Sequence, residues 1–343
     1  MNTKLFTEPT ETAVTEAAEI LRSGGLVAFP TETVYGLGGN GLDPDAARKI
    51  YAAKGRPSDN PLIIHVAEIA DAERYCITSP LYYKIAEHFM PGPITVIMPK
   101  RDCIPYEVTG GLDTVALRIP SHPIAHRLLA EAKIPVAAPS ANLSGRPSPT
   151  TAAHVITDMM GRINAIIDGG DCDFGVESTI VKIDGKHVTL LRPGAVTLEE
   201  LRELCGEVAV DPTITEKPAE NFIPLAPGMK YRHYAPRAHV TLLDGSHDAV
   251  TACLTEAVNH EDIGILCYDD MLPEALTSRS NVITLGKESD PTETAHKLFA
   301  ALRAFDDMQQ VTSILAPLPD KKGIGLAVYN RLIKAAGFDV KKI

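Results

Sequence analysis

The chain has 343 residues, 45% of them hydrophobic and 22% charged, which is the composition of an ordinary folded globular protein. This length exceeds what a single hydrophobic core usually supports, so we expect two domains. The formal net charge of −11 disfavours a protein whose main work is to hold nucleic acid, because phosphate contacts require a basic surface.

The sequence carries no sign of export, membrane insertion or a metal site. Residues 1–11 are mixed in charge and lack the apolar core of a signal peptide, and no apolar run approaches the ~18 residues of a membrane helix. The six cysteines include no C-x-x-C pair and have no histidines at ligand spacing. We therefore expect a cytoplasmic protein whose cysteines are small buried side chains.

Strands and helices alternate through residues 1–211, which we predict to form one domain. Helices are predicted in 10–25, which stops at two glycines, in 43–54, which opens with Asp43 and Pro44, in 122–132 and in 150–160. Short apolar runs predict strands at 26–32, 61–66, 93–99, 114–120, 134–140, 165–170, 178–183 and 187–194. Because strands outnumber helices, the pattern favours a twisted mixed α/β sheet over a regular doubly wound one.

Residues 212–237 separate this domain from a second one. Five prolines, at 212, 218, 224, 227 and 236, interrupt regular structure and predict a semi-rigid, extended linker. Beyond the linker, strands are predicted at 239–245, 263–270, 281–286 and 313–319, and helices are predicted to begin at Asp248, Pro291 and Gly325. This alternation predicts a small Rossmann-like α/β domain over residues 238–343.

The segment Gly36-Leu-Gly-Gly-Asn-Gly41 formally matches the G-x-G-x-x-G fingerprint of dinucleotide-binding proteins. The acidic residue that should follow ~20 residues later is absent, and the basic loop Lys54-Gly-Arg56-Pro-Ser-Asp-Asn60 stands there instead. We therefore interpret the glycines as a turn with close backbone packing and treat an NAD-dependent enzyme as a distant alternative. The P-loop string G-x-x-x-x-G-K-[ST] does not occur, so ATP would have to be held in another way.

Two similar loops combine an arginine with a hydroxyl group. The string Gly-Arg-Pro-Ser occurs at 55–58 and again at 145–148, the second time shortly after Ser140-Ala-Asn142, which follows an apolar strand. Small polar side chains and Gly/Pro loops at strand ends are where α/β sheets place ligand contacts. The planar fork of arginine suits a phosphate group, although a solvated helix end would explain Lys54 and Arg56 about equally well.

Further polar residues lie in or next to apolar strands. Arg118 and Arg192 occupy predicted strands, where a buried arginine needs an anionic partner, either a structural carboxylate or a substrate. On the pattern alone, His65 fits a core histidine equally well, and Thr31-Glu32-Thr33 fits a simple turn.

Taken in order, these strings resemble the threonylcarbamoyl-adenylate synthase family of YrdC type. The resemblance is carried by FPTETVYGLGGNG, KGRPSDNPLIIHV, PGPITVI, VALRIPSHP, APSANLSGRPSPT, GVESTIV and LLRPG, and by GMKYRHYAPRA and GIGLAVYNRLIKAAG further on. The K-x-R and S-x-N signatures of the family correspond to Lys54/Arg56 and Ser140/Asn142. The resemblance covers nearly the whole chain. The chain is similar to the long form of the family, which has an appended C-terminal domain.

The resemblance implies that L-threonine, bicarbonate and ATP give threonylcarbamoyl-AMP and pyrophosphate, which would make the enzyme a nucleotidyltransferase. A downstream tRNA threonylcarbamoyl-transferase enzyme would then move the threonylcarbamoyl group to an adenosine next to the anticodon. ATP is therefore expected as a substrate with magnesium on its triphosphate, and contact with tRNA or double-stranded RNA is expected to be weak at most.

The family's functional residues carry over onto matching positions of this chain. Catalytic roles are implied for Lys54, Arg56, Ser140 and Asn142. Threonine contacts are implied for Thr33, His65, Arg118, Ala138 through its backbone, and Ser178. Nucleotide contacts are implied for Arg56, Asn60, Thr114, Ser140, Ser148, Arg192 and a linker tyrosine, Tyr234 in preference to Tyr231.

These motifs contain no obvious nucleophile or base, so catalysis is expected to depend on alignment and charge neutralisation. The linker holds tyrosines and cations close together, and we predict that it folds over the pocket as a lid that excludes water.

Two alternatives of other kinds remain. A module without catalytic activity could bind RNA in the same basic concavity, although the net charge of −11 argues against it. A carbamoyltransferase that uses a related adenylate would instead require carbamoyl phosphate. Release of pyrophosphate from ATP that depends on threonine would distinguish the synthase from both.

Overall fold

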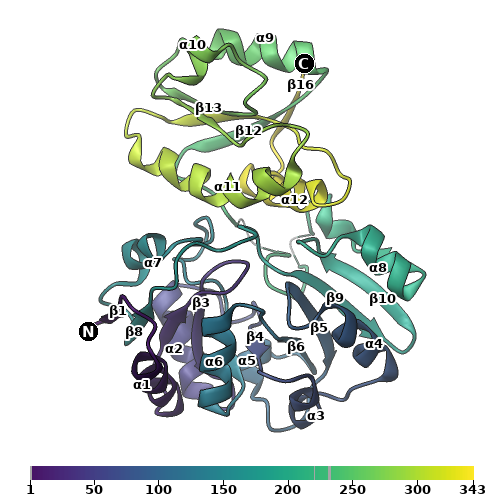
Figure 1. The fold of residues 1–343 in the computed structure, drawn as a ribbon. Coiled ribbons are helices and arrows are strands. Elements are labelled where there is room, and N and C mark those ends of the chain that lie inside the picture. Colours follow the sequence, from purple (N-terminus) through teal and green to yellow (C-terminus); the bar gives the residue numbers. More distant parts are fainter. Residues whose placement is uncertain (1, 220, 231–232) are drawn as a thin grey trace.

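The computed structural model describes residues 2–219, 221–230 and 233–343, and in them the chain forms two α/β units, each built on its own sheet (Figure 1). The larger sheet lies within residues 4–210 and the smaller one within residues 239–342. No helix in the described ranges is long and apolar enough to span a membrane.

The larger sheet combines parallel and antiparallel pairs, as predicted. Its strands are β1 (Lys4–Phe6), β2 (Val27–Phe29), β3 (Gly36–Asn40), β4 (Ile63–His65), β5 (Ile94–Pro99), β6 (Thr114–Arg118), β7 (Val136–Ala137), β8 (Ala165–Ile167), β9 (Thr179–Asp184), β10 (His187–Arg192) and β11 (Val208–Val210). Their order across the sheet is β1-β8-β2-β3-β7-β4-β6-β5-β9-β10-β11. The pairs β4–β6 and β5–β9 are parallel, whereas β4–β7, β5–β6 and β9–β10 are antiparallel.

Most helices of the first unit begin at a residue whose side chain caps them. The helices are α1 (Glu11–Arg22), α2 (Pro44–Lys54), α3 (Ala72–Tyr75), α4 (Pro80–Phe89), α5 (Tyr106–Thr109), α6 (Pro123–Ala132), α7 (Ala152–Met159) and α8 (Leu198–Cys205), and the short helices α3 and α5 have no such cap. The hydroxyl of Thr10 caps α1, and the carboxylate of Asp43 caps α2. Helix α2 ends at Gly55, whose φ of 62° is the left-handed conformation that glycine adopts without strain. This turn sets the direction of the loop that follows Lys54.

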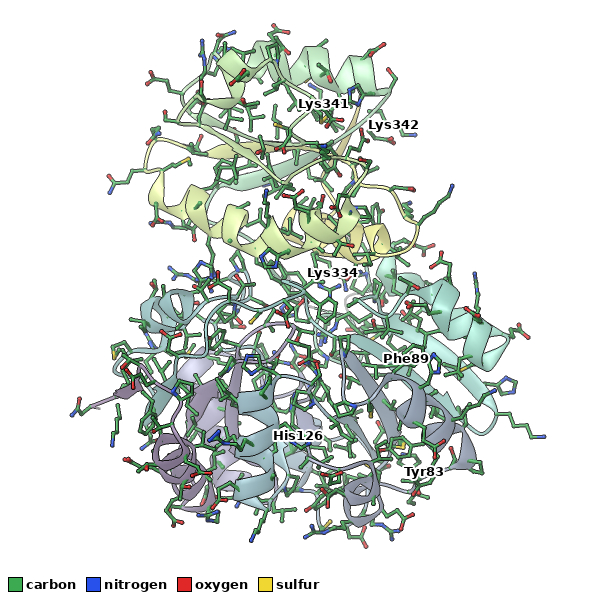
Figure 2. All side chains as sticks on the ribbon, in the orientation of Figure 1. Tyr83, Phe89, His126, Lys334, Lys341 and Lys342 are labelled. Carbon is green, nitrogen blue, oxygen red and sulfur yellow. The ribbon has the colours of Figure 1, made fainter. Side chains whose placement is uncertain are left out.

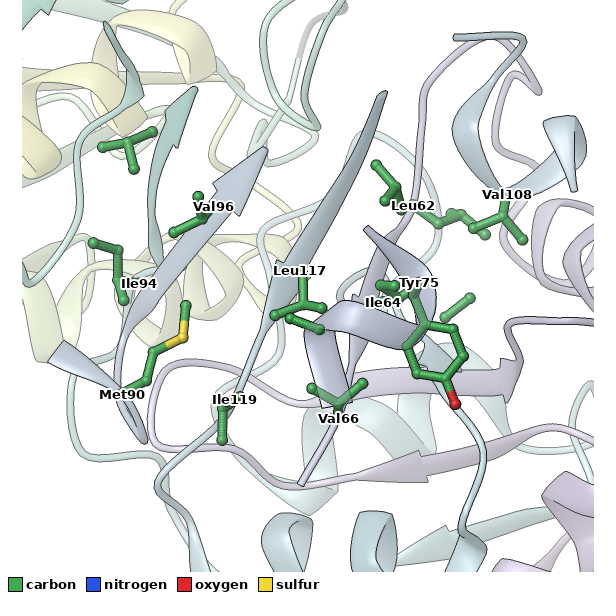
Figure 3. Packing of buried hydrophobic residues seen from close by; sticks show 14 of the residues in the cluster. Leu62, Ile64, Val66, Tyr75, Met90, Ile94, Val96, Val108, Leu117 and Ile119 are labelled. Atoms are coloured by element: carbon green, nitrogen blue, oxygen red, sulfur yellow. The ribbon is translucent and has the colours of Figure 1, made fainter. Parts of the chain in front are cut away.

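Strands β4, β5 and β6 supply the centre of the hydrophobic core (Figure 3). Ile64, Val96 and Leu117 come from these three strands and are fully buried. Burying one such side chain contributes about 1.5–3 kcal/mol to folding. The core therefore holds the strands firmly in place, and with them the polar residues at the strand ends.

The glycine-rich segment Gly36–Asn40 is a strand and not the turn that we predicted. Strand β3 lies inside the sheet, between β2 and β7. A Cβ atom on Gly38 would lie 2.8 Å from Cγ1 of Val136 and 2.9 Å from Cε1 of Phe29, so this position has no room for a side chain. The backbone of this segment packs closely, as expected, but it does so against the side chains of the neighbouring strands β2 and β7 and not within a turn.

The smaller sheet is entirely parallel within the part of the chain that the structure describes. Its strands are β12 (His239–Asp244), β13 (Ile263–Cys267), β14 (Val282–Thr284), β15 (Ser313–Pro317) and β16 (Val340–Lys342), in the order β14-β13-β15-β12-β16. The unit is the predicted parallel α/β fold. Its order places β15 between β13 and β12, which differs from the 3-2-1-4-5-6 order of dinucleotide-binding folds.

Two helices of the second unit face the first unit. The helices here are α9 (His247–Ala257), α10 (Glu274–Thr277), α11 (Pro291–Ala304) and α12 (Gly325–Ala335). Helices α11 and α12 lie between the smaller sheet and the first unit, whereas α9 and α10 lie on the far side (Figure 1). Figure 2 shows Lys334, on α12, at the junction of the two units. Side chains of α11 and α12 are therefore placed to contact the loops at the top of the larger sheet.

Candidate active site

The strand ends and loops of the first unit line a cavity whose empty space, about 680 Å³, includes space open to solvent. Many residues singled out in the sequence line this cavity, which brings together positions more than 170 residues apart. The lining residues among the predicted site positions are Lys54, Arg56, His65, Arg118, Ala138, Ser140, Asn142, Ser148, Ser178, Arg192 and Tyr234.

Lys54 and Arg56 enter the cavity from the end of α2. Lys54 is buried, and its Nζ donates to the backbone carbonyls of Ser140 and Asn142, at 2.6 and 2.5 Å, and more weakly to Oδ1 of Asn142, at 3.4 Å. These three contacts use all three donors of the ammonium group. Burial, followed by the charge of Arg56, holds the pKa of Lys54 well below its usual value. In this structure Lys54 therefore fastens the end of α2 to the loop of Ser140.

The loop of Ser140 is also held by its own side chains. The hydroxyl of Ser140 donates to Oδ1 of Asn142 at 2.6 Å, and Nδ2 of Asn142 donates to the carbonyls of Leu143 and Arg146 at 2.8 and 2.9 Å. Asn142 is buried and is fully engaged in these contacts. The S-x-N pattern thus builds a rigid turn whose backbone and hydroxyl face the cavity.

His65 and Arg118 lie side by side at the ends of two parallel strands. The register of β4 and β6 pairs their Cα positions. Nδ1 of His65 lies 3.1 Å from the carbonyl of Ile63 and 3.3 Å from that of Val136, so it must carry the proton. Burial, and next the charge of Arg118, lower the pKa of His65 to about 3. The ring is therefore neutral at pH 7, and its Nε2 is a hydrogen-bond acceptor.

Arg118 has a structural carboxylate as its neighbour. Nη2 of Arg118 lies 2.8 Å from Oε1 of Glu32, and both side chains are buried. The two groups are close but not aligned as a hydrogen bond, and Nε and Nη2 of Arg118 have no hydrogen-bond partner in the described ranges. Glu32 thus provides the charge balance that a buried arginine requires, while the guanidinium retains donors for a ligand.

Arg192 is positioned by the residue that precedes β9. Its Nε donates to the carbonyl of Ser178 at 3.0 Å, and its Nη2 donates to the hydroxyl of Ser178 at 3.1 Å. Oγ of Ser178 also lies 2.8 Å from the hydroxyl of Thr95. Burial lowers the pKa values of both Arg192 and Arg56 to about 10, so both groups stay charged at neutral pH.

Ser148 contacts the one acidic side chain among the described residues that line the cavity. Its hydroxyl donates to Oε1 of Glu177, which is buried. Burial raises the pKa of Glu177, but the charges of Arg331 and Arg192 outweigh burial, and the pKa lies below its usual value. Glu177 is therefore an anion, and the single proton of Ser148 points toward it.

The linker closes one side of the cavity with Pro227, Gly228, His233 and Tyr234. Tyr234 is buried and packs against Phe299 of α11, with ring centroids 5.2 Å apart. Lys230 lies 3.1 Å from Asp59 and so connects the linker to the loop of Arg56. The less favoured Tyr231 lies outside the described residues.

Three predicted site residues do not line the cavity. Thr33 is fully buried, and its hydroxyl lies 3.0 Å from that of Thr31, which does line the cavity. Asn60 is buried and accepts from Nε of Arg56 through its backbone carbonyl. Thr114 pairs with Pro99 at the start of β6. For Thr33, the prediction differs from the structure by two residues, because Thr31 of the same turn lines the cavity in its place. The sequence pattern of Thr31-Glu32-Thr33 does not show which threonine points toward the cavity.

Several lining residues were not given a site role on the sequence alone. They include Thr31, Glu177, Gly228 and His233, and Arg146 entered only as the arginine of the second Gly-Arg-Pro-Ser loop. A signal existed for Arg146, because it belongs to the second Gly-Arg-Pro-Ser string. The two strings are not equivalent in space, since the first contributes Arg56 and exposes Ser58, whereas the second contributes both Arg146 and Ser148.

The cavity is strongly basic within an acidic protein. Lys54, Arg56, Arg118, Arg146 and Arg192 line it, against the single carboxylate of Glu177. No group of three or more His, Cys, Asp or Glu residues is arranged to hold a metal ion in the described ranges. The arrangement can bind an anionic ligand and neutralise charge that develops on it.

Comparisons with known proteins agree on one family. Residues 19–194 match the family model for Sua5, YciO and YrdC proteins that is described as "Telomere recombination", and residues 196–337 match "Threonylcarbamoyl-AMP synthase, C-terminal domain". The threonylcarbamoyl-AMP synthase of Pyrococcus abyssi is 44% identical over 336 residues, which is 95% of each chain. That of Bacillus subtilis is 43% identical and covers 94% of this chain and 93% of its own. The crystal structure of P. abyssi Sua5 complexed with L-threonine superposes with a TM-score of 0.92 at 42% identity, over 100% of both chains.

Proposed function

This chain belongs to the threonylcarbamoyl-AMP synthase family, and we infer that it makes threonylcarbamoyl-AMP from L-threonine, bicarbonate and ATP. The observation that supports this most strongly is the convergence of the K-x-R and S-x-N motifs, His65, Arg118 and Arg192 on one buried basic cavity. Because the whole chain has a net charge of −11, the excess of cations in this cavity is a property of the site and not of the protein as a whole.

We propose that Arg118 and His65 bind threonine. The guanidinium of Arg118 can donate two hydrogen bonds to the carboxylate of the amino acid. Nε2 of the neutral His65 can accept a hydrogen bond from the hydroxyl or the amine. The threonine found in the P. abyssi structure makes such a site plausible in a chain of 42% identity.

Arg56, Arg192 and Ser148, which line the same cavity, are suited to the nucleotide. The two arginines remain charged at neutral pH and can neutralise phosphate oxygens. The hydroxyl of Ser148 donates its hydrogen bond to Glu177, so its oxygen can only accept a hydrogen bond from a ligand. We therefore assign Ser148 to a donor on the nucleotide, such as a ribose hydroxyl or the adenine amino group, and not to a phosphate.

The proposed reaction needs charge control more than a side-chain nucleophile. The neutral amine of threonine takes up bicarbonate with loss of water and becomes a carbamate. A carbamate oxygen then attacks the α-phosphorus of ATP, forming a new P–O bond as the bond to pyrophosphate breaks. Nearby cations favour both the neutral amine and the anionic carbamate, and they stabilise charge on the leaving pyrophosphate. Lys54 holds the loop of Ser140 in place.

We propose that magnesium enters with the triphosphate of ATP. The cavity offers no cluster of acidic ligands in the described residues, and the carboxylate of Glu177 is already engaged by Ser148 and Arg331. The residues present therefore do not form a resident metal site, and no step above depends on one.

We also propose how the chain is divided and where it acts. Residues 1–211 would form the catalytic domain, 212–237 a lid and 238–343 the second domain. As a nucleotidyltransferase that supplies a tRNA threonylcarbamoyl-transferase enzyme, the protein would work in the cytoplasm. Its acidic charge favours handover of the adenylate over tight binding of tRNA by this chain.

Pyrophosphate release by the purified full-length protein tests the proposal. Release from ATP should require threonine and bicarbonate together, and the product should carry both the threonine carbon skeleton and the bicarbonate carbon. Release without threonine, or use of carbamoyl phosphate in place of bicarbonate and ATP, would exclude this function.

A further inference from the structure

A carboxylate in the wall of a nucleotide cavity works against nucleotide binding. Glu177 is 6% exposed and directly precedes Ser178. It receives the hydrogen bond of Ser148, so it lies next to a proposed nucleotide contact. Like charges repel strongly where water is excluded, so an unbalanced Glu177 would oppose a triphosphate.

The second unit supplies the positive charge that balances this carboxylate. Arg331, on α12, is fully buried, and its Nε lies 2.7 Å from Oε2 of Glu177. Its Nη2 donates to the carbonyl of Glu177 at 3.2 Å, and its Nη1 donates to the carbonyl of Pro193 at 2.9 Å. One guanidinium therefore contacts the residue before Ser178 and the residue after Arg192.

We propose that Arg331 is a positioning residue for ATP: it acts as the counter-charge of Glu177 and keeps that carboxylate, and the Ser148 that donates to it, compatible with a bound triphosphate. Arg331 does not line the cavity and meets two residues that do, pairing with Glu177 and lying 5.6 Å from the ring centroid of Tyr234, and the proposed role is the one through Glu177. The proposal rests on the nucleotide site assigned above. It gives the second unit a direct part in ATP binding by the first.

A second buried ion pair between the units provides a matched control. Nη2 of Arg303, on α11, lies 2.8 Å from Oδ2 of Asp158 and 2.6 Å from the carbonyl of Pro147. Asp158 also pairs with Arg146 and does not line the cavity. Loss of Arg303 should therefore weaken the docking of the two units without leaving a bare carboxylate in the cavity wall.

The test compares Arg331→Met, Arg303→Met and the double variant Glu177→Gln/Arg331→Met in the full-length protein. Calorimetric titration gives the Kd of ATP, steady-state pyrophosphate release gives the KM of threonine, and a thermal melt checks folding.

We expect Arg331→Met to raise the Kd of ATP at least about tenfold, because an uncompensated charge is left beside the ligand. The KM of threonine should change by less than about threefold, since Arg118 and His65 lie on other strands. Removing the charge of Glu177 as well should restore most of the ATP affinity.

Arg303→Met should lower Tm as much as Arg331→Met does and leave the Kd of ATP within about threefold of the unmodified protein. The counter-charge role is wrong if the double variant binds ATP no better than Arg331→Met, or if Arg303→Met weakens ATP equally. Should Arg331→Met fail to fold, Arg331→Gln removes the charge and keeps a donor for the carbonyl groups; it should also raise the Kd of ATP at least about tenfold, and binding within about threefold of the unmodified protein would contradict the proposal. Absence of threonine-dependent pyrophosphate release in the unmodified protein would instead count against the proposed function, and the ATP titrations would still test Arg331.

Discussion

At the scale of single residues, the central question is how Arg118 can serve both the fold and a substrate. Its nearest anion is Glu32, at 2.8 Å, and the contact is not aligned as a hydrogen bond. The pair balances charge, which a buried arginine requires, without using the donors that a carboxylate ligand would need. The structural and the substrate interpretations of Arg118 are therefore compatible.

Substitution of Arg118 by alanine should raise the threonine requirement far more than the ATP requirement. Two charge-assisted hydrogen bonds of about 1.5–3 kcal/mol each would be lost. This corresponds to at least about a hundredfold in threonine affinity. Initial rates of pyrophosphate release, measured across each substrate in turn, give the two KM values.

Glu32→Gln is the matched control for this prediction, because it removes the ion pair and leaves the guanidinium. If Arg118 acts only as the partner of Glu32, both variants should impair threonine use to the same degree. If Arg118 binds the carboxylate, Glu32→Gln should retain most of the threonine affinity while losing some thermal stability.

At the scale of elements, the linker has the position expected of a lid. Pro227, Gly228, His233 and Tyr234 line the cavity, and Lys230 lies 3.1 Å from Asp59 on the opposite loop. The segment is therefore held from both units, since Tyr234 also packs on Phe299. A lid of this kind would keep water from the mixed anhydride.

Limited proteolysis tests whether the linker closes over bound substrates. Tryptic cleavage after Lys230 should become several-fold slower when ATP and threonine are added together, and less so with either alone. Tyr234→Phe removes only a hydroxyl and should reduce synthesis with little change in Tm. Cleavage that is indifferent to ligands, together with full activity of a chain cut after Val210, would contradict the lid.

The elements differ in how far the sequence predicted them. Helix α2 was predicted with its observed end, and Asp43 and Pro44 marked its start; in the structure Gly55 caps its last turn. Helix α4 has the same kind of signal, since Ser79 caps it and Pro80 occupies its first position, but it was not predicted. Strand β3 was mistaken for a turn, because glycines indicate that side chains are excluded and do not indicate the direction of the backbone.

The candidate site shows the same division between local and distant information. Motif resemblance predicts site roles for Lys54, Ser140 and Asn142, which contact one another, and for Arg56, which lines the same cavity. It could not identify Arg331, which lies 154 residues from Glu177 and whose role depends on how two units dock. Such a contact leaves no periodicity or spacing in the sequence from which it could be inferred.

At the scale of the whole molecule, buried cations hold the two units together. Arg303 reaches Asp158, Arg331 reaches Glu177, and Lys334 donates to the carbonyl of Gly228 in the linker. Arg303 and Arg331 have a carboxylate partner, whereas Lys334 donates to a neutral carbonyl. A buried ammonium without a carboxylate is costly, so Lys334 should make the docking of the units depend on pH.

Burial, and next the charge of Arg331, lower the pKa of Lys334 from 10.5 to about 7 in the folded protein. Between about pH 7 and pH 10.5 the unfolded chain therefore binds more protons at this position than the folded protein does, so stability from this group rises with pH. Across that window, Tm of the unmodified protein minus Tm of Lys334→Met should increase by roughly 2 °C per pH unit for a chain of this size. Melts at pH 7, 8 and 9 measure this difference.

The buried thiols of Cys76, Cys172 and Cys267, whose pKa values burial raises to about 12, act on stability in the opposite direction, but they are present in both proteins, so their effect cancels in the Tm difference. A Tm difference that stays constant from pH 7 to pH 9 would mean that Lys334 keeps its proton in the fold, and the junction would then owe none of its pH dependence to this residue.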